Sequence, residues 1–220
     1  TTFHNQVTAP GALAAISVPA SSDALVALAD FDDYAETRAQ WHNNWDINSQ
    51  HALHFGLELR HIDSPETFIH SNFDASDLAT GTIPIRYYGG IVENALIQRN
   101  SQRDIVGLYS QYQGKLFDST QFTLGLRHDN FSNIGSRLSP RLGLVQALNQ
   151  QHSIKLLYGE AFRAPSDIEL NIQNNIVVLG NPDLKPEVVK TWDLIWVGHW
   201  QSSTSLSLGY FENHFDDSIT

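Results

Sequence analysis

Apolar and polar residues alternate with a period of two through most of this chain. The clearest run covers residues 34–47, where odd positions are mostly apolar or aromatic and even positions are polar. This pattern is typical of a β-strand with one apolar and one polar face. Seven more runs follow, and their first apolar residues are Leu53, Val106, Phe122, Leu138, Ile154, Trp192 and Leu206. The pattern predicts about eight strands, each of roughly ten to fourteen residues.

The connections between these strands alternate between short and long. Short polar turns are predicted at 48–50, 118–120, 149–151 and 201–203, and longer connections at 64–103, 132–136 and 163–187. Soluble β-sandwiches use shorter strands and do not sort their loops in this way. Membrane strands need about 9–11 residues, with short turns at one end and long loops at the other. We therefore predict an all-β fold, namely an antiparallel up-and-down transmembrane β-barrel segment with short periplasmic turns and long extracellular loops.

The two long segments outside the strands are predicted to be irregular. Residues 1–33 show no persistent period and are expected to form an extracellular loop, and residues 64–103 are rich in Asp, Ser, Thr, Gly and Asn. The whole chain, residues 1–220, is expected to form one partial barrel domain.

The charges agree with a membrane wall. On the apolar faces, the few charges lie toward long-loop ends: Glu160, Lys190 and Glu212. On the opposite faces lie charges that suit a polar lumen, such as Arg60, Lys155 and Asp193. A lipid-facing charge at the membrane midplane costs about 2–4 kcal/mol, so this distribution favours the barrel.

The tryptophans lie where a barrel places aromatic girdles. Trp45 and Trp200 adjoin short turns, and Trp192 lies eight residues from Trp200 on the same face. At about 3.3 Å per residue, this separation approaches the height of an apolar membrane band. Packing between two soluble sheets is the alternative explanation.

Composition excludes several classes of protein. No run of 18 apolar residues is present, which excludes helical membrane spans. The net charge of −11 offers no basic surface for nucleic acid. With no cysteine, the chain has neither disulfides nor thiolate sites. Because it starts at Thr1 without an initiator, we expect an internal fragment of a larger protein.

The sequence gives little evidence for metal binding or catalysis. His51 and His54 point to opposite faces of a strand, and the spacing of His70, Asp74 and Asp77 matches no metal motif. The acidic residues Glu160, Asp167 and Glu169 are interpreted as solvated carboxylates. We therefore expect no metal, no cofactor, no catalytic residues and no enzymatic activity.

Ligand binding is a better use of the long loops. Arg86, Tyr87 and Tyr88 offer a cation and two aromatic rings, which suit an amphipathic ligand at a barrel mouth. Anchoring of the loop by its own aromatic rings is the alternative. Arg163 at a strand end is a further candidate, either facing ligand or pairing with a carboxylate.

Four segments carry a resemblance to a known family. They are Leu138-Ser139-Pro140-Arg141-Leu142-Gly143, residues 158–166 (YGEAFRAPS), residues 180–187 (GNPDLKPE) and residues 209–219 with GYFEN and DDSI. In order and position they resemble the outer-membrane barrel of TonB-dependent receptors. The resemblance covers most of residues 34–219.

The resemblance implies part of a 22-stranded barrel in the outer membrane of a Gram-negative bacterium. It implies energy-coupled uptake of a siderophore-bound iron, haem, cobalamin or glycan ligand. It also implies coupling to the TonB–ExbB–ExbD complex through a plug domain that this chain lacks. In the family, one set of residues shapes an extracellular loop and is structural: Arg163, Ala164, Pro165, Gly180, Asn181, Pro182, Leu184, Pro186 and Glu187.

Two other functions remain open from the sequence. The chain is alternatively a soluble β-rich glycan-binding or glycan-cleaving domain, or part of a passive porin. The leucines on the apolar faces distinguish a membrane barrel from the soluble domain. They face lipid in a barrel, whereas they face a second sheet in a sandwich.

Overall fold

A computed structural model describes residues 2–5, 27–30, 34–74, 77, 80, 82, 86–173, 179–200 and 204–219. The chain forms two compact units. One comprises residues 1–36, 62–102 and 165–184, and the other comprises residues 37–61, 103–164 and 185–220. The predicted turn at 201–203 lies outside the described residues.

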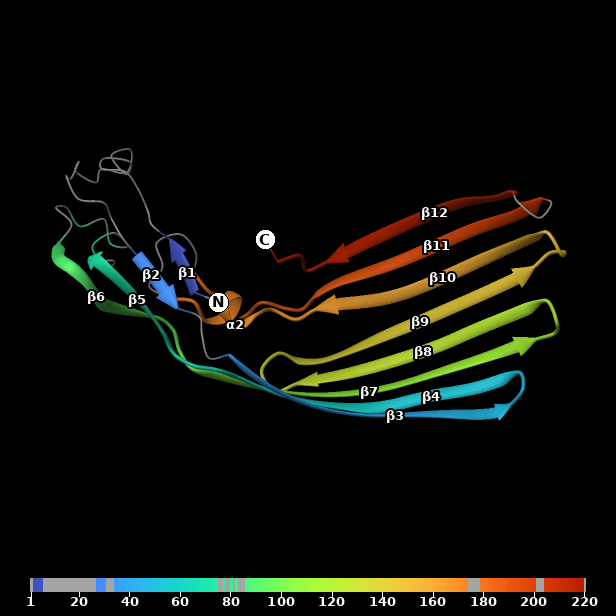
Figure 1. The fold of residues 1–220 in the computed structure, drawn as a ribbon, viewed down its shortest axis with the longest axis horizontal. Coiled ribbons are helices and arrows are strands. Elements are labelled where there is room, and N and C mark those ends of the chain that lie inside the picture. Colours follow the sequence, from blue (N-terminus) through green and yellow to red (C-terminus); the bar gives the residue numbers. More distant parts are fainter. Residues whose placement is uncertain are drawn as a thin grey trace. The chain divides into compact units, whose positions relative to one another are not determined.

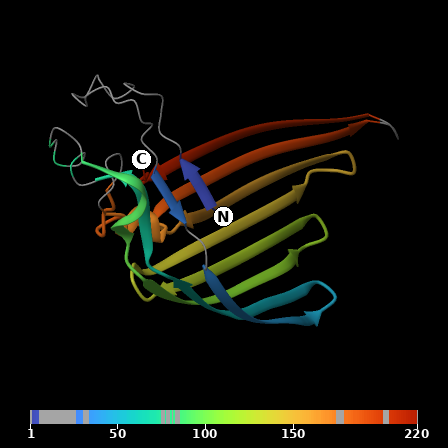
Figure 2. The ribbon, with the colours of Figure 1, turned by 60° about the vertical axis from the view of Figure 1, so that its left-hand side comes forward.

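Eight long strands form a single sheet, which contains most of the second unit (Figure 1). Their order across the sheet is β12-β11-β10-β9-β8-β7-β4-β3. The strands are β3 (Ala35–Asn48), β4 (His51–Ser64), β7 (Ser101–Leu116), β8 (Thr120–Phe131), β9 (Gly135–Ala147), β10 (His152–Arg163), β11 (Glu187–Trp200) and β12 (Thr204–Asp216). Figure 2 shows the same strands side by side from a second direction. The prediction of an all-β, up-and-down antiparallel sheet of eight long strands is confirmed.

The register places apolar side chains in continuous rows across the sheet. One row runs across six strands through Tyr112, Leu124, Leu142, Tyr158, Trp192 and Glu212. The neighbouring row, one residue along, is Gln111, Gly125, Arg141, Gly159, Thr191 and Asn213. Because successive side chains of a strand point to opposite faces, the two rows define an apolar and a polar face.

Two of the predicted short turns are closed by an asparagine at their start. The Asn48 side chain accepts a hydrogen bond from the Gln50 N–H at 2.9 Å. The Asn149 side chain accepts from the N–H groups of Gln151 and His152 at 2.8 and 2.9 Å. Asparagine favours such turns because its side chain binds the backbone two residues further on.

A smaller sheet of order β1-β2-β5-β6 lies in the first unit. Its strands are β1 (Thr2–Asn5), β2 (Ala27–Asp30), β5 (Thr67–Phe73) and β6 (Tyr87–Gln98). The prediction of irregular structure throughout 64–103 is therefore wrong, and the first 33 residues also contribute strands. Three register shifts interrupt the pairing of β5 with β6, and they explain why no regular period of two is visible there.

The long connection between β10 and β11 contains a short helix, α2 (Asp167–Asn171), that was not predicted. Ser166 caps this helix by accepting from the Glu169 N–H, while the Glu169 side chain accepts from the Ser166 N–H. This capping box is a Ser-x-x-Glu pattern, which is a sequence signal for a helix start. No helix in the described part of the chain is long and apolar enough to cross a membrane.

The faces of β4 and β10 lead to a test in the full-length protein. Leu57→Arg or Leu156→Arg puts a cation on the apolar face, which costs about 2–4 kcal/mol at the membrane midplane. We expect both variants to lose assembly into the outer membrane, measured as loss of the heat-modifiable band on a gel.

Leu157→Arg is the matched control. Leu157 adjoins Leu156 on β10 but pairs with Gly143 and Asp193 on the polar face. Normal assembly of Leu157→Arg beside failed assembly of Leu156→Arg would support the assignment of faces. Normal assembly of both Leu57→Arg and Leu156→Arg would contradict it.

Candidate functional site on the polar face

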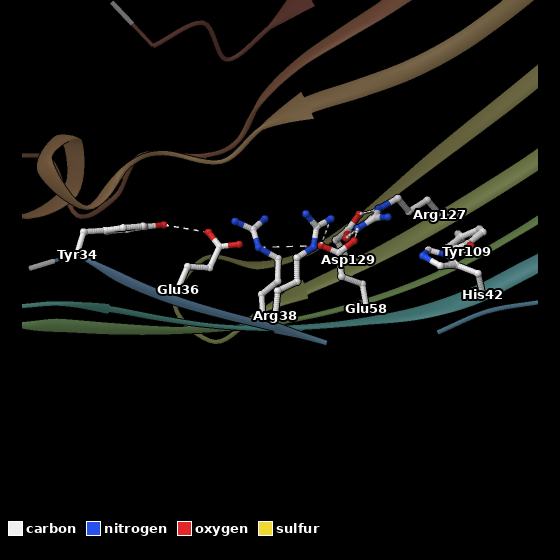
Figure 3. A network of polar contacts seen from close by, with 9 residues as sticks. Tyr34, Glu36, Arg38, His42, Glu58, Tyr109, Arg127 and Asp129 are labelled. Carbon is white, nitrogen blue, oxygen red and sulfur yellow. Dashed lines mark hydrogen bonds and ion pairs between the residues drawn. The ribbon is translucent and has the colours of Figure 1, made fainter. Parts of the chain in front are cut away.

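A network of charged side chains ties three strands together on the polar face (Figure 3). Glu58 of β4 contacts Arg38 of β3 at 2.9 Å and Arg127 of β8 at 3.1 Å. Arg127 also donates to Asp129 on its own strand, with N–O distances of 2.6 to 3.0 Å. The two carboxylates are buried, with residue exposures of 6% for Glu58 and 2% for Asp129. This set of four residues is called the ionic network below.

Two side chains in this region reach across an intervening strand at a glycine. Arg127 passes over β7 at Gly107, where a Cβ atom would lie 2.7 Å from its Nη2. Tyr109 of β7 passes over Gly56 of β4, and its hydroxyl shares a 2.5 Å hydrogen bond with His42 of β3. Glycine is required at both positions because a side chain there would occupy the path of the crossing group.

The carboxylates of the ionic network are paired with cations. Arg38 and Arg127 contact the two buried carboxylates, and Arg60 lies 4.0 Å from Glu58, so neither acid is left unpaired. An unpaired buried charge is strongly destabilising, whereas paired and hydrogen-bonded charges are tolerated. The network is therefore a fixed, polar part of the wall, and its geometry suits structural support rather than proton transfer or catalysis.

A hollow of about 460 Å³ lies on the sheet further along, toward β9, β10 and β11. Arg141 and Asp193 bring charge to its lining, and Gly143 and Gly159 place no side chain in it. The polar face thus combines charges, hydroxyls and small residues, which suits contact with water and polar solutes.

The apolar face carries its charges near the long connections, as predicted. Glu160 pairs in register with Lys190, and the Lys190 ammonium contacts Asp216 at 2.8 Å. The adjacent row places the rings of Tyr158 and Trp192 with centroids 4.3 Å apart. At the opposite end of β11, Trp196 and Trp200 lie 5.7 Å apart. These positions agree with two aromatic bands.

The candidate ligand residues Arg86, Tyr87 and Tyr88 lie close together at one end of β6. Tyr87 and Tyr88 belong to the strand itself, so the prediction that they lie in a long loop is wrong. The Arg86 guanidinium contacts the buried Asp74 carboxylate at 3.2 Å while 69% of its side chain stays exposed. Partial burial and the hydrogen bond with Asp74 raise the pKa of the Tyr88 hydroxyl.

Arg163 lies at the end of β10 and contacts Glu187 of β11 at 3.5 Å. The two residues are partners in the strand register. Glu187 also accepts from the backbone N–H of Ile219 at 3.3 Å. This arrangement favours the structural alternative for Arg163, since its guanidinium helps to hold the end of the strand pair.

The loop residues singled out by the resemblance form a compact, hydrogen-bonded turn. Gly180 N–H donates to Ile172 C=O at 2.7 Å, and Asn181 N–H donates to Glu169 C=O at 2.9 Å. The Asn181 side chain accepts from Asp183 N–H at 3.0 Å. Among the remaining residues of this set, Pro165 is fully buried, Pro182 is exposed, and three are half-buried: Ala164, Leu184 and Pro186.

The candidate metal-binding histidines His51, His54 and His70 each lie close to a polar side chain of another residue. His51 contacts the Tyr112 hydroxyl at 2.9 Å and His54 contacts Asn44 at 2.7 Å, on opposite faces of β4. His70 lies in β5, 3.9 Å from Glu93. Within the described residues, no group of three or more His, Cys, Asp or Glu side chains has metal-binding geometry.

The sequence did not single out the ionic network as a site. Glu58 was recognised as a polar-face residue of its strand, but no local pattern links it to residues 38 and 127. The available signal was a charge on the polar face next to glycines on neighbouring strands. That signal identifies the contacting residues only when the order of the strands in the sheet is known.

The sorted faces, the strand lengths and the alternation of turns define the wall of a transmembrane β-barrel. The family model described as "TonB dependent receptor-like, beta-barrel" matches residues 2–220. The chain belongs to this family.

Curated relatives agree with this membership, and a solved structure shares the fold. A probable TonB-dependent siderophore receptor of Acinetobacter baumannii, PirA, is 31% identical over 130 residues, which are 52% of this chain and 17% of the relative. An iron-regulated outer membrane virulence protein of Vibrio cholerae is 34% identical over 110 residues, 48% of this chain and 17% of the relative. The crystal structure of the siderophore receptor PirA from Acinetobacter baumannii superposes with a TM-score of 0.59 at 21% identity, covering 88% of this chain and 27% of that one. The matched part of the chain thus spans about a sixth of the length of the two curated relatives and about a quarter of the solved structure.

The ionic network predicts non-additive effects in the full-length protein. Arg127→Leu removes a positive charge that lies beside the Asp129 and Glu58 carboxylates. We expect the free energy of unfolding to fall by about 2 kcal/mol. This value is below the 3–5 kcal/mol of fully buried pairs because 38% of the Arg127 side chain is exposed. Denaturant unfolding in detergent measures it.

The double variant Arg127→Leu/Asp129→Leu is the control, because it removes the cation together with the carboxylate that it contacts most closely. We expect the double variant to be more stable than the sum of the two single variants indicates. Strictly additive effects would contradict a coupled network.

Proposed function

We propose that this chain is part of the barrel wall of an outer-membrane receptor that takes up a ferric siderophore by TonB-dependent transport. The observation that carries the proposal is the eight-stranded sheet, which has one apolar face and one polar, charge-bearing face. Such a sheet separates lipid from an aqueous interior. The names of two relatives, a probable TonB-dependent siderophore receptor and a ferrienterobactin receptor, support a ferric siderophore as the ligand class, ahead of haem, cobalamin or glycans.

The apolar face argues against a soluble glycan-binding or glycan-cleaving domain. Large side chains on this face are half-exposed in the isolated chain, among them Leu124, Leu126, Leu194, Leu208 and Tyr210. No second layer covers them among the described residues. Lipid is the natural partner for such a face, whereas a soluble fold would bury it.

Energy coupling distinguishes the proposed receptor from a passive porin. In the proposed function, the TonB–ExbB–ExbD complex acts on a plug domain encoded elsewhere in the full-length protein. The chain supplies about eight strands, and open sheet edges are not stable in a bilayer. Further strands from the same protein must therefore complete the barrel around it.

Uptake of radiolabelled iron tests this function. We expect deletion of the full-length gene in a siderophore-deficient strain to abolish uptake of at least one ferric siderophore from a panel, and the intact gene to restore it. Uptake should also be lost when TonB is deleted. Uptake that persists without TonB would favour a passive pore, and normal uptake of every siderophore in the deletion strain would contradict the proposal.

Arg86, Tyr87 and Tyr88 are proposed as ligand contacts of this receptor. Arg86 is anchored by Asp74 yet largely exposed, so its charge is held in place and accessible to an anionic ligand. Tyr87 and Tyr88 are each 37% exposed and supply adjoining rings. A rigid cation beside aromatic side chains suits recognition of an anionic, aromatic chelator.

Arg86→Ala in the full-length receptor is expected to weaken siderophore binding by about tenfold or more, as for loss of a charged hydrogen bond. Fluorescence quenching or radioligand binding measures this change. Arg163→Ala is the matched control, since Glu187 engages that guanidinium, and its binding affinity should remain near that of the native receptor. Equal losses in the two variants would contradict the assignment of distinct roles.

A further inference from the structure

Three cations on the polar face of the large sheet have side chains that no other described residue engages. They are Lys115 of β7, Arg141 of β9 and Lys155 of β10. Within the described part of the chain, none of the three side chains makes a hydrogen bond or an ion pair. Their charges are therefore not offset by the protein around them, in contrast to the guanidinium of Arg127, which two buried carboxylates hold.

The strand register places these three cations on one face. Lys115 and Lys155 belong to a single row across β7 to β10, which runs through Gln121 and Val145. Arg141 lies four residues from Val145 on β9, and an even separation puts both side chains on the same face. At about 3.3 Å per residue, Arg141 and the row of the two lysines are about 13 Å apart along the strands. The cations therefore extend from the middle of β9 toward the short turns.

The surface beside Arg141 is open. Arg141 is exposed and lines the hollow of about 460 Å³, together with Thr123 and Thr191. Its register partner on β10 is Gly159, where an added Cβ atom would have no heavy atom within 4 Å. The hollow is many times larger than the share of one water molecule in the liquid. A solute larger than water can therefore reach the guanidinium.

The charge around this hollow favours an anion. Asp193 lines the same hollow, but it lies on β11, so that strand β10 separates it from Arg141 in the register. The other acid of the lining, Glu160, is engaged by the Tyr158 hydroxyl and by Arg137. Three unengaged cations thus stand against one unengaged acid in this part of the face, although the whole chain carries a net charge of −11. Clustered charge of one sign raises the local concentration of ions of the other sign.

We propose that Arg141, Lys155 and Lys115 form a cationic track, which a negatively charged iron chelate contacts as it passes along the polar face. The proposal rests on the proposed uptake function and narrows its substrate to chelates of net negative charge. Arg141 makes contact beside the hollow, and the two lysines make contact nearer the short turns. Ion contacts of this water-facing kind are individually weak, which suits passage rather than tight binding. They are additional to the ligand contact proposed for Arg86.

Neutral variants of the full-length receptor test the track. We expect Arg141→Gln and Lys155→Gln each to lower the maximal rate of uptake of a negatively charged ferric chelate by about threefold, as for loss of one solvent-accessible ion contact. The double variant should lower it by about tenfold, because the two sites are well separated and their effects add in free energy. The dissociation constant for the chelate should stay near the native value, since binding is assigned to other residues. Uptake of radiolabelled iron measures the rate, and equilibrium binding to cells that lack TonB measures the constant.

Charge-preserving variants separate the effect of charge from an effect on structure. Arg141→Lys and Lys155→Arg keep a cation at each position and should transport at about the native rate. Arg99→Gln and Lys185→Gln are the matched controls, because they remove exposed cations from connections between strands. Heat-modifiability of every variant checks that the barrel is assembled. Equal losses in the charge-preserving variants or in the controls would overturn the proposal, as would a native rate in the double variant.

A panel of radiolabelled ferric chelates separates this proposal from the proposed function. The panel contains negatively charged catecholate and citrate chelates and uncharged trihydroxamate chelates. We expect the native receptor to take up at least one of the negatively charged chelates. Uptake of uncharged chelates alone would overturn the cationic track and leave TonB-dependent uptake standing, whereas no uptake of any chelate would contradict the proposed function itself.

Discussion

Everything in the larger unit depends on the antiparallel backbone ladder and its register. A membrane offers no hydrogen-bond partners to the backbone, so each strand must satisfy its N–H and C=O groups on its neighbours. The side-chain period is two, and a slip of one residue would turn every lipid-facing side chain to the aqueous side. The unbroken rows from Tyr112 to Glu212 and from Gln111 to Asn213 show this register maintained across six strands.

On that ladder, the polar face adds connections between strands that are not neighbours. Arg127 reaches from β8 over Gly107 to Glu58, and Tyr109 reaches from β7 over Gly56 to His42. Each contact spans one intervening strand, and the glycine there provides the space. These contacts are polar, so they hold the water-facing side of the sheet in order without an apolar core.

The first unit is ordered by different interactions from those of the large sheet. Three of its strands have only four to seven residues, and the pairing of β5 with β6 shifts register three times. Its order depends on specific groups instead: the capping box of α2, the bonds from Gly180 and Asn181 to the helix region, and Asp74 with Arg86. Recognition suits such a region, because individual side chains are presented at defined positions while the long sheet carries the stability.

The sequence by itself determined the eight long strands, the described short turns between them, the two faces and the family. Each of these rests on local periodicity or on contiguous motifs such as residues 158–166 and 180–187. The end of β10 at Arg163 could be predicted because Pro165 follows it, and α2 carried a readable capping signal. Only the tertiary structure decided the β5–β6 pairing and the crossing of Arg127 over Gly107. These contacts join residues distant along the chain, and their formation depends on strand order and register rather than on any local pattern.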